Sequence, residues 1–337
     1  MPHTKDTGEL PLVDVHAHVV LEGTFGHAGS YGPELDEGPD HTRFRAGSYV
    51  LDGVRYRDSP FMDVGLRLER MAEAGIDRQV LSPNPLTFFH RIPAPDAVAF
   101  ARRHNELLAA LVADHPALEG FAALPLQDVD AAVAELEHAT RSLGLRGAYV
   151  GTAADRELDD PAFDALYEAC VDLDVPLLVH PAPDGTDNPV KDPRLGRFDL
   201  ELSVGFATDE TLAVATMVYG GVLHRHPQLD VCISHGGGAV PYLYGRLAAA
   251  AAHRPWSPEW LREPGAFDRL LRRLWFDVHV HDRTSLELLA ARVGTGRLVY
   301  GTNFGGWDQG SGLDLGELDA TVRRNGLRLL RDPLGSR

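Results

Sequence analysis

The stretch Asp14-Val15-His16-Ala17-His18 ends a short apolar run near the start of the chain, and it decides how the rest of the sequence is interpreted. In a β-strand, residues two apart point to the same side, so His16 and His18 face one direction. Two imidazoles at a strand end are typical of a zinc-type metal site. Two core histidines with satisfied hydrogen bonds are the alternative interpretation of this pair.

Two further histidines also end apolar runs. His180 follows the run 177–179, and His235 follows the run 231–234. Imidazole is the commonest metal ligand in proteins and also a general base near neutral pH. Four histidines at predicted strand ends therefore indicate a metal centre with an acid or base beside it. A phosphate cradle at the three glycines after His235 is the weaker interpretation, because no Lys or Ser/Thr follows at P-loop spacing.

Strand-like and helix-like stretches alternate along most of the chain. Apolar runs predict eight strands, at 12–18, 79–82, 120–125, 147–150, 176–180, 229–234, 274–280 and 298–301. Three- and four-residue apolar spacing predicts helices at 64–74, 96–114, 129–143, 161–173, 208–224, 285–293 and 315–324. Such alternation is typical of a parallel α/β fold, and eight strands favour a closed (β/α)8 TIM barrel. We therefore predict one barrel domain over residues 1–337.

Two stretches interrupt this alternation. Residues 22–63 are rich in Gly, His, Asp and Arg and follow the first strand, and residues 182–200 form a Pro-, Asp- and Gly-rich loop after the fifth. Long loops in compact domains are usually functional lids or disordered segments. We expect the insertion at about 22–63 to be a lid or a substrate-binding subregion.

The composition restricts the partners. The 337 residues carry a formal net charge of −17 and are 44% hydrophobic. An acidic surface repels phosphates and anionic lipid, so we expect neither nucleic acid nor a membrane as partner. An anionic substrate then needs a metal or placed arginines. No run approaches the roughly 18 apolar residues of a membrane span, residues 1–10 lack an apolar signal segment, and Cys170 and Cys232 are expected to be buried free thiols. These features predict a cytoplasmic enzyme.

The histidine pattern resembles the metal site of the amidohydrolase superfamily, which has His-x-His on strand one, single histidines on strands five and six, and an acid on strand eight. The stretch 234–246, Ser-His-Gly-Gly-Gly-Ala-Val-Pro-Tyr-Leu-Tyr-Gly-Arg, resembles the aminocarboxymuconate-semialdehyde decarboxylase branch. Residues 147–152, 217–222 and 280–282 are also similar to that branch. The resemblance covers roughly residues 12–306.

The resemblance implies roles for particular residues. His16, His18 and His180 would bind a divalent metal, usually zinc, although three histidines also accept Mn²⁺, Fe²⁺ or Co²⁺. His235 would be the catalytic histidine. Arg246 would reach the active site of a neighbouring subunit and bind the substrate carboxylate, which implies a homodimer.

A second arginine of the family holds carboxylate within its own subunit. In this resemblance Arg57, in the insertion, matches it, and Arg55 is the alternative. A guanidinium suits this task because it binds a carboxylate through two parallel hydrogen bonds.

The strand-eight acid is missing from this chain. Gly301-Thr302-Asn303 stands where the family has Gly-Thr-Asp. Asn303 is only a weak metal ligand through its carbonyl oxygen, and it cannot take a proton. Either His235 is the only acid or base, or the Asn is a deliberate change that stops turnover, or the chain catalyses a different reaction. Asp308 could substitute if its loop folds inward, but we expect a solvated loop acid.

The predicted substrate wall also differs from that of the family. The family has tryptophans near the segment that here contains Phe198 and Leu202, and an aromatic residue after the strand-eight acid is replaced by glycine, with Trp307 adjacent. His281 is expected to line the cavity or to support the residues that do, and His279 is as readily a surface residue. We therefore expect a substrate other than the one for which the branch is named.

These features together predict a metal-dependent non-oxidative decarboxylase of a small aromatic or unsaturated carboxylic acid. A hydrolase, or a cyclising or dehydrating enzyme of a specialised pathway, such as one that closes a heterocycle from an aminophenol-type acid, is the alternative. The same metal could polarise an ester or amide carbonyl. A catalytically silent binding protein is a third hypothesis, and Asn303 is its only support.

Overall fold

The computed structural model describes residues 10–152, 154–183, 192–306, 308–309 and 313–332. Its strands form three sheets, with orders β1-β5-β6, β11-β10-β9-β8-β7 and β2-β3-β4. The strands of the first two sheets pair in parallel throughout. They are β1 Val13–Val19, β5 Arg78–Pro83, β6 Leu118–Gly120, β7 Ala148–Gly151, β8 Leu177–His180, β9 Val231–Ile233, β10 Trp275–Asp277 and β11 Leu298–Val299.

Backbone contacts connect the edges of these two parallel sheets. A parallel bridge pairs Ala122, just after β6, with Ala148 of β7, and another pairs Ala17 of β1 with Phe304, beyond β11. The backbone N–H of Val15 also donates to the carbonyl of Tyr300 at 3.0 Å. The eight strands therefore follow one another in a ring, in sequence order.

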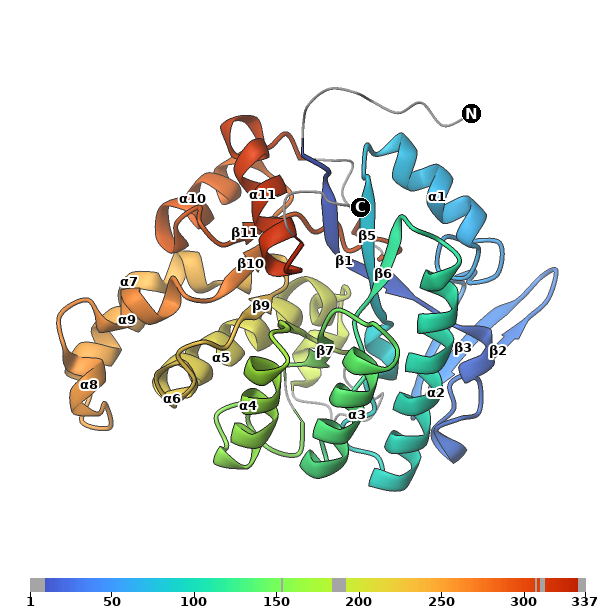
Figure 1. Ribbon diagram of the computed structural model, residues 1–337, viewed down its shortest axis with the longest axis horizontal. Helices are drawn as coiled ribbons and strands as arrows, with labels where there is room; N and C mark the ends of the chain where they lie inside the picture. Colours follow the sequence, from blue (N-terminus) through green and yellow to red (C-terminus); the bar gives the residue numbers. More distant parts are fainter. Residues whose placement is uncertain (1–9, 153, 184–191, 307, 310–312, 333–337) are drawn as a thin grey trace.

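The helices lie outside the central strands (Figure 1). Three of them begin at an aspartate whose side chain accepts a backbone N–H of the first turn: Asp63, Asp128 and Asp282. Apolar residues of the strands and the helices pack into one large core, and a second cluster gathers strand residues such as Val15, Tyr149 and Trp275. The helices are α1 Val64–Glu73, α2 Ala94–Ala113, α3 Val129–Arg141, α4 Asp164–Asp172, α5 Phe206–Tyr219, α6 Val222–Arg225, α7 Val240–His253, α8 Glu259–Arg262, α9 Ala266–Leu271, α10 Arg283–Val293 and α11 Asp319–Leu329.

The stretch 22–63 contains the third sheet, which is antiparallel. It consists of β2 Glu34–Glu37, β3 Thr42–Ala46 and β4 Tyr49–Asp52, and it lies at the edge of the molecule in Figure 1. Phe44 and Tyr56 are buried, and their rings pack at a tilt with centroids 4.7 Å apart. They join a separate apolar cluster with residues of the α2 region, such as Phe89 and Phe100, so the insertion has packing of its own.

Seven of the eight predicted strands agree with the structure within a few residues. One predicted strand and one predicted helix differ from it. The strand expected at 120–125 is β6, which ends at Gly120. The helix expected at 208–224 is two helices, because Gly221 takes a left-handed φ of 79° and ends the first. Helices α7 to α9 had not been expected.

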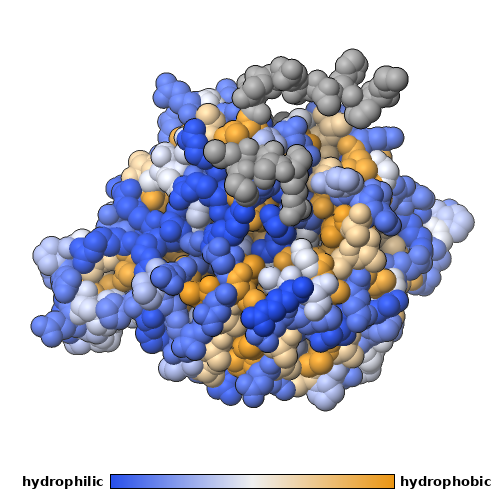
Figure 2. Space-filling view, viewed as in Figure 1, coloured by the Kyte–Doolittle hydropathy of each residue, from blue (hydrophilic) through white to orange (hydrophobic). Residues whose placement is uncertain are grey.

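The two cysteines are buried and free, as expected. Among the described residues, no helix has both the length and the apolar character needed to cross a membrane. The face shown in Figure 2 is mostly hydrophilic, with apolar residues in several separate groups, which agrees with the large net charge.

Candidate metal centre and cavity

Three histidines from two strands converge at the carboxyl ends of the barrel strands. His16 and His18 belong to β1, and His180 ends β8. All three are buried, and one ring nitrogen of each lies within 4.8 Å of the others. The alternation of β1 explains why two ligands point inward from one strand.

Each of these rings is held by its Nδ1. The Nδ1 of His16 lies 2.7 Å from the carboxylate of Asp277, that of His18 lies 2.9 Å from the hydroxyl of Ser82, and that of His180 lies 2.5 Å from the carbonyl of Pro181. The Ser82 hydroxyl donates its own hydrogen to the carbonyl of Ala17, so it accepts from His18.

The three Nε2 atoms are buried and have no hydrogen-bond partner among the described residues. Burial comes first among the causes that lower the pKa of each ring, to about 3 for His18. Neutral imidazoles with fixed Nδ1–H groups and unpartnered Nε2 lone pairs are what a metal site requires. The donor set therefore fits a divalent cation.

His235 lies beside this group. Its ring centroid is 4.9 Å from that of His16 and 5.0 Å from that of His180. Its Nδ1 lies 2.6 Å from the buried carboxylate of Glu210 on α5. Burial opposes a charge on the ring, but Glu210 outweighs it and raises the pKa of His235 to about 9.

The turn after His235 requires glycine. Gly238 has a φ of 62°, and a Cβ there would lie 2.1 Å from the carbonyl oxygen of Ala207. The turn therefore packs directly on α5, the helix that carries Glu210. This contact explains why position 238 is glycine.

Asn303 follows β11 and faces both the histidines and a loop acid. Its Nδ2 donates to Oδ1 of Asp308 at 2.5 Å. The other oxygen, Oδ2, lies 3.2 Å from Nε2 of His279 and 3.3 Å from Nε2 of His281. Burial would raise the pKa of Asp308, but these hydrogen bonds and the nearby histidines hold it well below its usual value.

The expectation of a solvated loop acid at Asp308 was wrong, because its side chain is only 10% exposed. His279 is also buried, so it is not a surface residue. His235, His279 and Asp308 form a second group whose ligand atoms all lie within 4.8 Å of one another.

A cavity of about 220 Å³ opens beside the histidines. His18, His180 and Asn303 form its polar end, and the remaining wall is mainly apolar and aromatic. The insertion supplies a large part of that wall. The lining residues are His18, Tyr49, Leu51, Val54, Tyr56, Phe61, Asn84, Pro85, Leu86, His180, Pro183, Leu202, Phe206, Asn303, Gly305 and Gly306.

Leu202 is the one residue of the expected substrate wall among these described lining residues. Phe198 is 80% exposed, the side chain of His281 is 55% exposed, and neither is among the described residues that line the cavity. Trp307 lies outside the described residues.

None of the predicted arginines lines the cavity in the described part of the chain. An Nη atom of Arg57 pairs with Glu22 at 2.6 Å, and Arg55 donates to the carbonyl of Gly38 at 3.4 Å. Arg246 is exposed on α7. The roles expected for these residues stay predictions.

Sequence reasoning missed the residues that hold the histidines. Asp277, Glu210 and Ser82 bind the Nδ1 atoms of His16, His235 and His18. A carboxylate inside an apolar strand, as in Trp275-Phe276-Asp277, was a usable signal, because a buried charge needs a partner. Glu210, within a predicted helix, gave no such signal.

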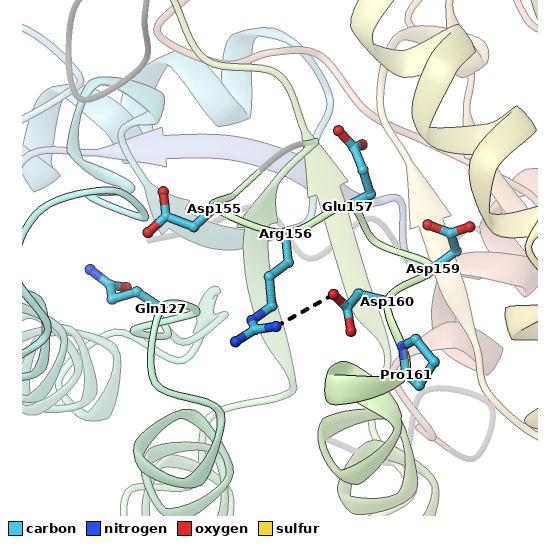
Figure 3. Close-up of a pocket in the computed structure, with 7 residues that line it drawn as sticks. All are labelled: Gln127, Asp155, Arg156, Glu157, Asp159, Asp160 and Pro161. Atoms are coloured by element: carbon cyan, nitrogen blue, oxygen red, sulfur yellow. Dashed lines mark hydrogen bonds and ion pairs between the residues drawn. The ribbon is translucent and has the colours of Figure 1, made fainter.

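A second hollow lies between the loop after β7 and the residue Gln127 (Figure 3). Four carboxylates line it, those of Asp155, Glu157, Asp159 and Asp160, and Arg156 pairs with the last at 3.5 Å. An open, acidic hollow repels anions. It does not suit a carboxylic acid, whereas the cavity beside the histidines does.

Comparison with known families identifies the family of the chain. The amidohydrolase family model matches residues 13–329. The chain belongs to the amidohydrolase family. The match spans every barrel strand, as well as the four histidines and Asn303.

Three curated relatives of this amidohydrolase share 28–29% identity with it. One is 2-amino-3-carboxymuconate-6-semialdehyde decarboxylase of Dictyostelium discoideum, 29% identical, with 87% of this chain and 81% of the relative covered. Another is gamma-resorcylate decarboxylase of a Rhizobium species, 29% identical, with coverages of 79% and 83%. A third is 2-keto-4-carboxy-3-hexenedioate hydratase of a Sphingobium species, 28% identical, with coverages of 71% and 69%.

Solved structures show the same fold. IDCase of Metarhizium anisopliae aligns with a TM-score of 0.77 at 22% identity, covering 95% of this chain and 97% of that one. The 2,6-dihydroxybenzoate decarboxylase of Rhizobium aligns with a TM-score of 0.74 at 22% identity, covering 96% and 99%. The predicted TIM-barrel fold is thereby confirmed. The dihydroxybenzoic acid decarboxylase of a Polaromonas species, with a TM-score of 0.72 at 21% identity and coverages of 96% and 97%, contains bound manganese and 2-nitroresorcinol.

Proposed function

We propose that this amidohydrolase is a metal-dependent, non-oxidative decarboxylase of a small aromatic or unsaturated carboxylic acid. The observation that carries the proposal is the set of three unpartnered, buried Nε2 atoms next to the His235–Glu210 pair at one end of an apolar cavity. The names of two curated relatives support the reaction type.

His16, His18 and His180 would hold the cation. Zinc suits three histidines, and Mn²⁺, Fe²⁺ and Co²⁺ are also accepted by such a set. When bound, the cation supplies the positive charge that attracts and orients the substrate carboxylate. The three Nδ1 partners keep the rings in the orientation that this requires.

His235 is proposed to deliver the proton. Decarboxylation of an aromatic acid replaces the C–CO₂⁻ bond by a C–H bond, so one proton must reach the ring carbon that carries the carboxylate. Glu210 raises the pKa of His235 to about 9, and it holds the ring by its Nδ1. The imidazolium can then donate from Nε2, and the electron pair of the broken C–C bond returns to the ring as CO₂ leaves.

The cavity is proposed to bind the ring of the substrate. Tyr49, Leu51, Tyr56, Phe61 and Phe206 offer apolar and aromatic contact and exclude water. β4 and the segment that follows it supply this part of the wall, so we propose that residues 22–63 act as a lid or a substrate-binding subregion. For Arg57 to hold the carboxylate within its own subunit, it would have to leave Glu22.

We further propose a homodimer in which Arg246 contributes to the neighbouring active site. Tyr242, one turn before it on α7, is 83% exposed, and Leu212 on the adjacent helix α5 is 59% exposed. Exposed apolar side chains on touching helices favour a protein partner.

Mixing two inactive variants tests this arrangement. If Arg246 serves the partner's site, dimers of a His235→Asn subunit and an Arg246→Ala subunit contain one intact site and regain activity. Mixtures that stay inactive would contradict it.

A hydratase, hydrolase or cyclising enzyme is the second candidate. The Sphingobium relative named as a hydratase supports it, as does the loss of the strand-eight acid at Asn303. The cation and His235 could equally serve the addition or removal of water.

Product analysis decides between the two. The metal-loaded protein is incubated with hydroxybenzoates, aminobenzoates and muconate-like acids, and the masses of the products are measured by mass spectrometry. Loss of CO₂, absent in His235→Asn, supports the decarboxylase. Gain or loss of water instead supports the second candidate. If the metal-loaded protein forms no product from any acid of the panel, the result counts against decarboxylation.

A further inference from the structure

Asn303 and Asp308 together occupy the place of the missing acid. The Nδ2 of Asn303 donates to Oδ1 of Asp308 at 2.5 Å. An ionised carboxylate only accepts hydrogen bonds, so the amide must turn its NH₂ toward Asp308. Chemistry therefore fixes which end of the amide is nitrogen and which is oxygen.

The other end of the amide faces the metal-binding histidines. Asn303, His18 and His180 together line the polar end of the cavity. With its nitrogen turned to Asp308, Oδ1 is the polar side-chain atom that Asn303 has left for the cavity that it lines with His18 and His180. A carbonyl oxygen there is a neutral ligand in place of a carboxylate.

Asp308 is itself fixed. Its Oδ2 lies 3.2 Å from Nε2 of His279 and 3.3 Å from Nε2 of His281. The backbone N–H of His279 donates to Asp277, the residue that holds His16. The carboxylate is therefore connected to the same framework as the metal ligands.

The backbone leaves room for the amide only because position 306 is glycine. The N–H of Gly306 donates to the carbonyl of Asn303 at 2.6 Å, which closes a tight turn. A Cβ at position 306 would lie 2.5 Å from Nδ2 of Asn303. The turn thus packs against the amide and restricts its rotation.

We propose that Asp308 is a positioning residue that turns the Asn303 amide so that Oδ1 becomes a ligand of the cation, while the negative charge lies one hydrogen bond farther away. Two residues would then do what a single aspartate does in the family pattern. The inference rests on the metal site of the proposed function, but not on the reaction that the site catalyses.

The test measures metal binding in the full chain without substrate. Dissociation constants for Mn²⁺ and Zn²⁺ are obtained by chelator competition, and the ions bound per chain by elemental analysis. Asp308→Ala should weaken binding by about 10–100-fold, the usual effect of removing a partner of a metal ligand. Glu317→Gln is the control. It changes an exposed acid later in the chain and should leave the metal dissociation constants unchanged.

A second variant separates positioning from general damage. A carboxylate at position 303 offers an oxygen to the cation in either orientation, so it does not need Asp308 to turn it. Asp308→Ala should therefore have little effect on metal affinity in an Asn303→Asp background. Should Asp308→Ala fail to fold, Asp308→Asn is used, which keeps the shape and should weaken binding less. The absorption spectrum of the Co²⁺-loaded protein should change in Asp308→Ala and not in Glu317→Gln.

Three results would overturn the inference. One is unchanged affinity in Asp308→Ala. Another is an equal loss in both backgrounds. The third is two ions per wild-type chain and one in Asp308→Ala, which makes Asp308 a direct ligand of a second ion with His235 and His279. If wild type binds no divalent cation at all, the proposed function fails as well, whereas binding without the predicted loss affects this inference alone.

Discussion

The carboxylate of Asp277 lies 2.7 Å from Nδ1 of His16, although 261 positions separate the two residues in the sequence. The other oxygen of the same carboxylate accepts the backbone N–H groups of Gly236 and His279, each at 3.1 Å. One buried acid on β10 therefore orients a predicted metal ligand on β1 and the turn that carries His235.

Replacing Asp277 by alanine should weaken divalent-metal binding by about 10–100-fold, because the His16 ring loses the acceptor that fixes its orientation. Chelator competition measures the change. Asp130→Asn, an exposed acid on α3, is the matched control. Equal affinities of wild type and Asp277→Ala would contradict the role given to this contact.

Glu210→Gln should lower kcat by about 10²–10⁴-fold with little effect on KM, because the proton donor loses its charged partner while the cavity wall is unchanged. The measurement is steady-state kinetics on the substrate that product analysis identifies. Glu106→Gln, an exposed residue of α2, serves as the control. A rise in KM at constant kcat would instead indicate a role in substrate binding.

The two faces of β4 should respond differently to the same substitution. Leu51 lines the cavity, and its neighbour Val50 is 46% exposed on the other face. Leu51→Trp should reduce kcat/KM by about 10–200-fold by filling the space of the substrate ring. Val50→Trp should leave kcat/KM near the wild-type value, and a comparable loss in both variants would argue against the insertion as a cavity wall.

Removing the cation should lower stability. A ligand that binds only the folded chain adds about 4 kcal/mol when its concentration is 1,000 times Kd. Thermal unfolding with and without a chelator should therefore show a lower Tm in the chelated wild type. In His180→Ala the unfolding curves with and without chelator should nearly coincide. If the chelator still lowers the Tm of this variant, the stabilising ion is bound elsewhere.

Asp230 predicts a pH dependence of stability away from the metal site. It accepts hydrogen bonds from Nε1 of Trp275 and from Arg331, both at 2.8 Å, and it pairs with Arg297. Although burial opposes the shift, these donors lower the pKa of Asp230 below its value of about 4 in an unfolded chain. The stabilisation is therefore present above about pH 4 and is lost as the pH falls through the lower folded-state pKa.

Asp230→Asn should accordingly cost about 1–3 kcal/mol of unfolding free energy at pH 7. The difference from wild type should shrink as the pH falls below about 4. Urea unfolding at several pH values measures both quantities. If the difference in unfolding free energy grew as the pH fell, Asp230 would not have the lowered pKa in the folded chain on which this prediction depends.

The barrel and its histidines were predictable because both depend on local pattern. Continuous apolar runs mark strands buried on both faces, and His16, His18 and His180 lie in or at the end of such runs. The eight predicted strands correspond to the ring of the structure, with the largest shift at β6.

Other features depend on contacts that the sequence does not display. The inward fold of Asp308 depends on His279 and His281, which lie 29 and 27 positions away. The exposed Phe198 and the pairing of Arg57 with Glu22 were equally invisible to local pattern. The antiparallel sheet of the insertion was missed because two of its strands, β2 and β3, consist largely of polar residues.

The ring of strands closes through contacts between the beginning and the end of the chain. Asp14 on β1 accepts the backbone N–H of Thr302 at 3.1 Å and its hydroxyl at 2.7 Å, and His16 depends on Asp277. During synthesis, the three histidines leave the ribosome long before these partners exist. Metal binding in the final geometry must therefore follow translation of nearly the entire polypeptide. A truncated chain that ends before β10 would contain the three histidines but lack Asp277, which orients His16.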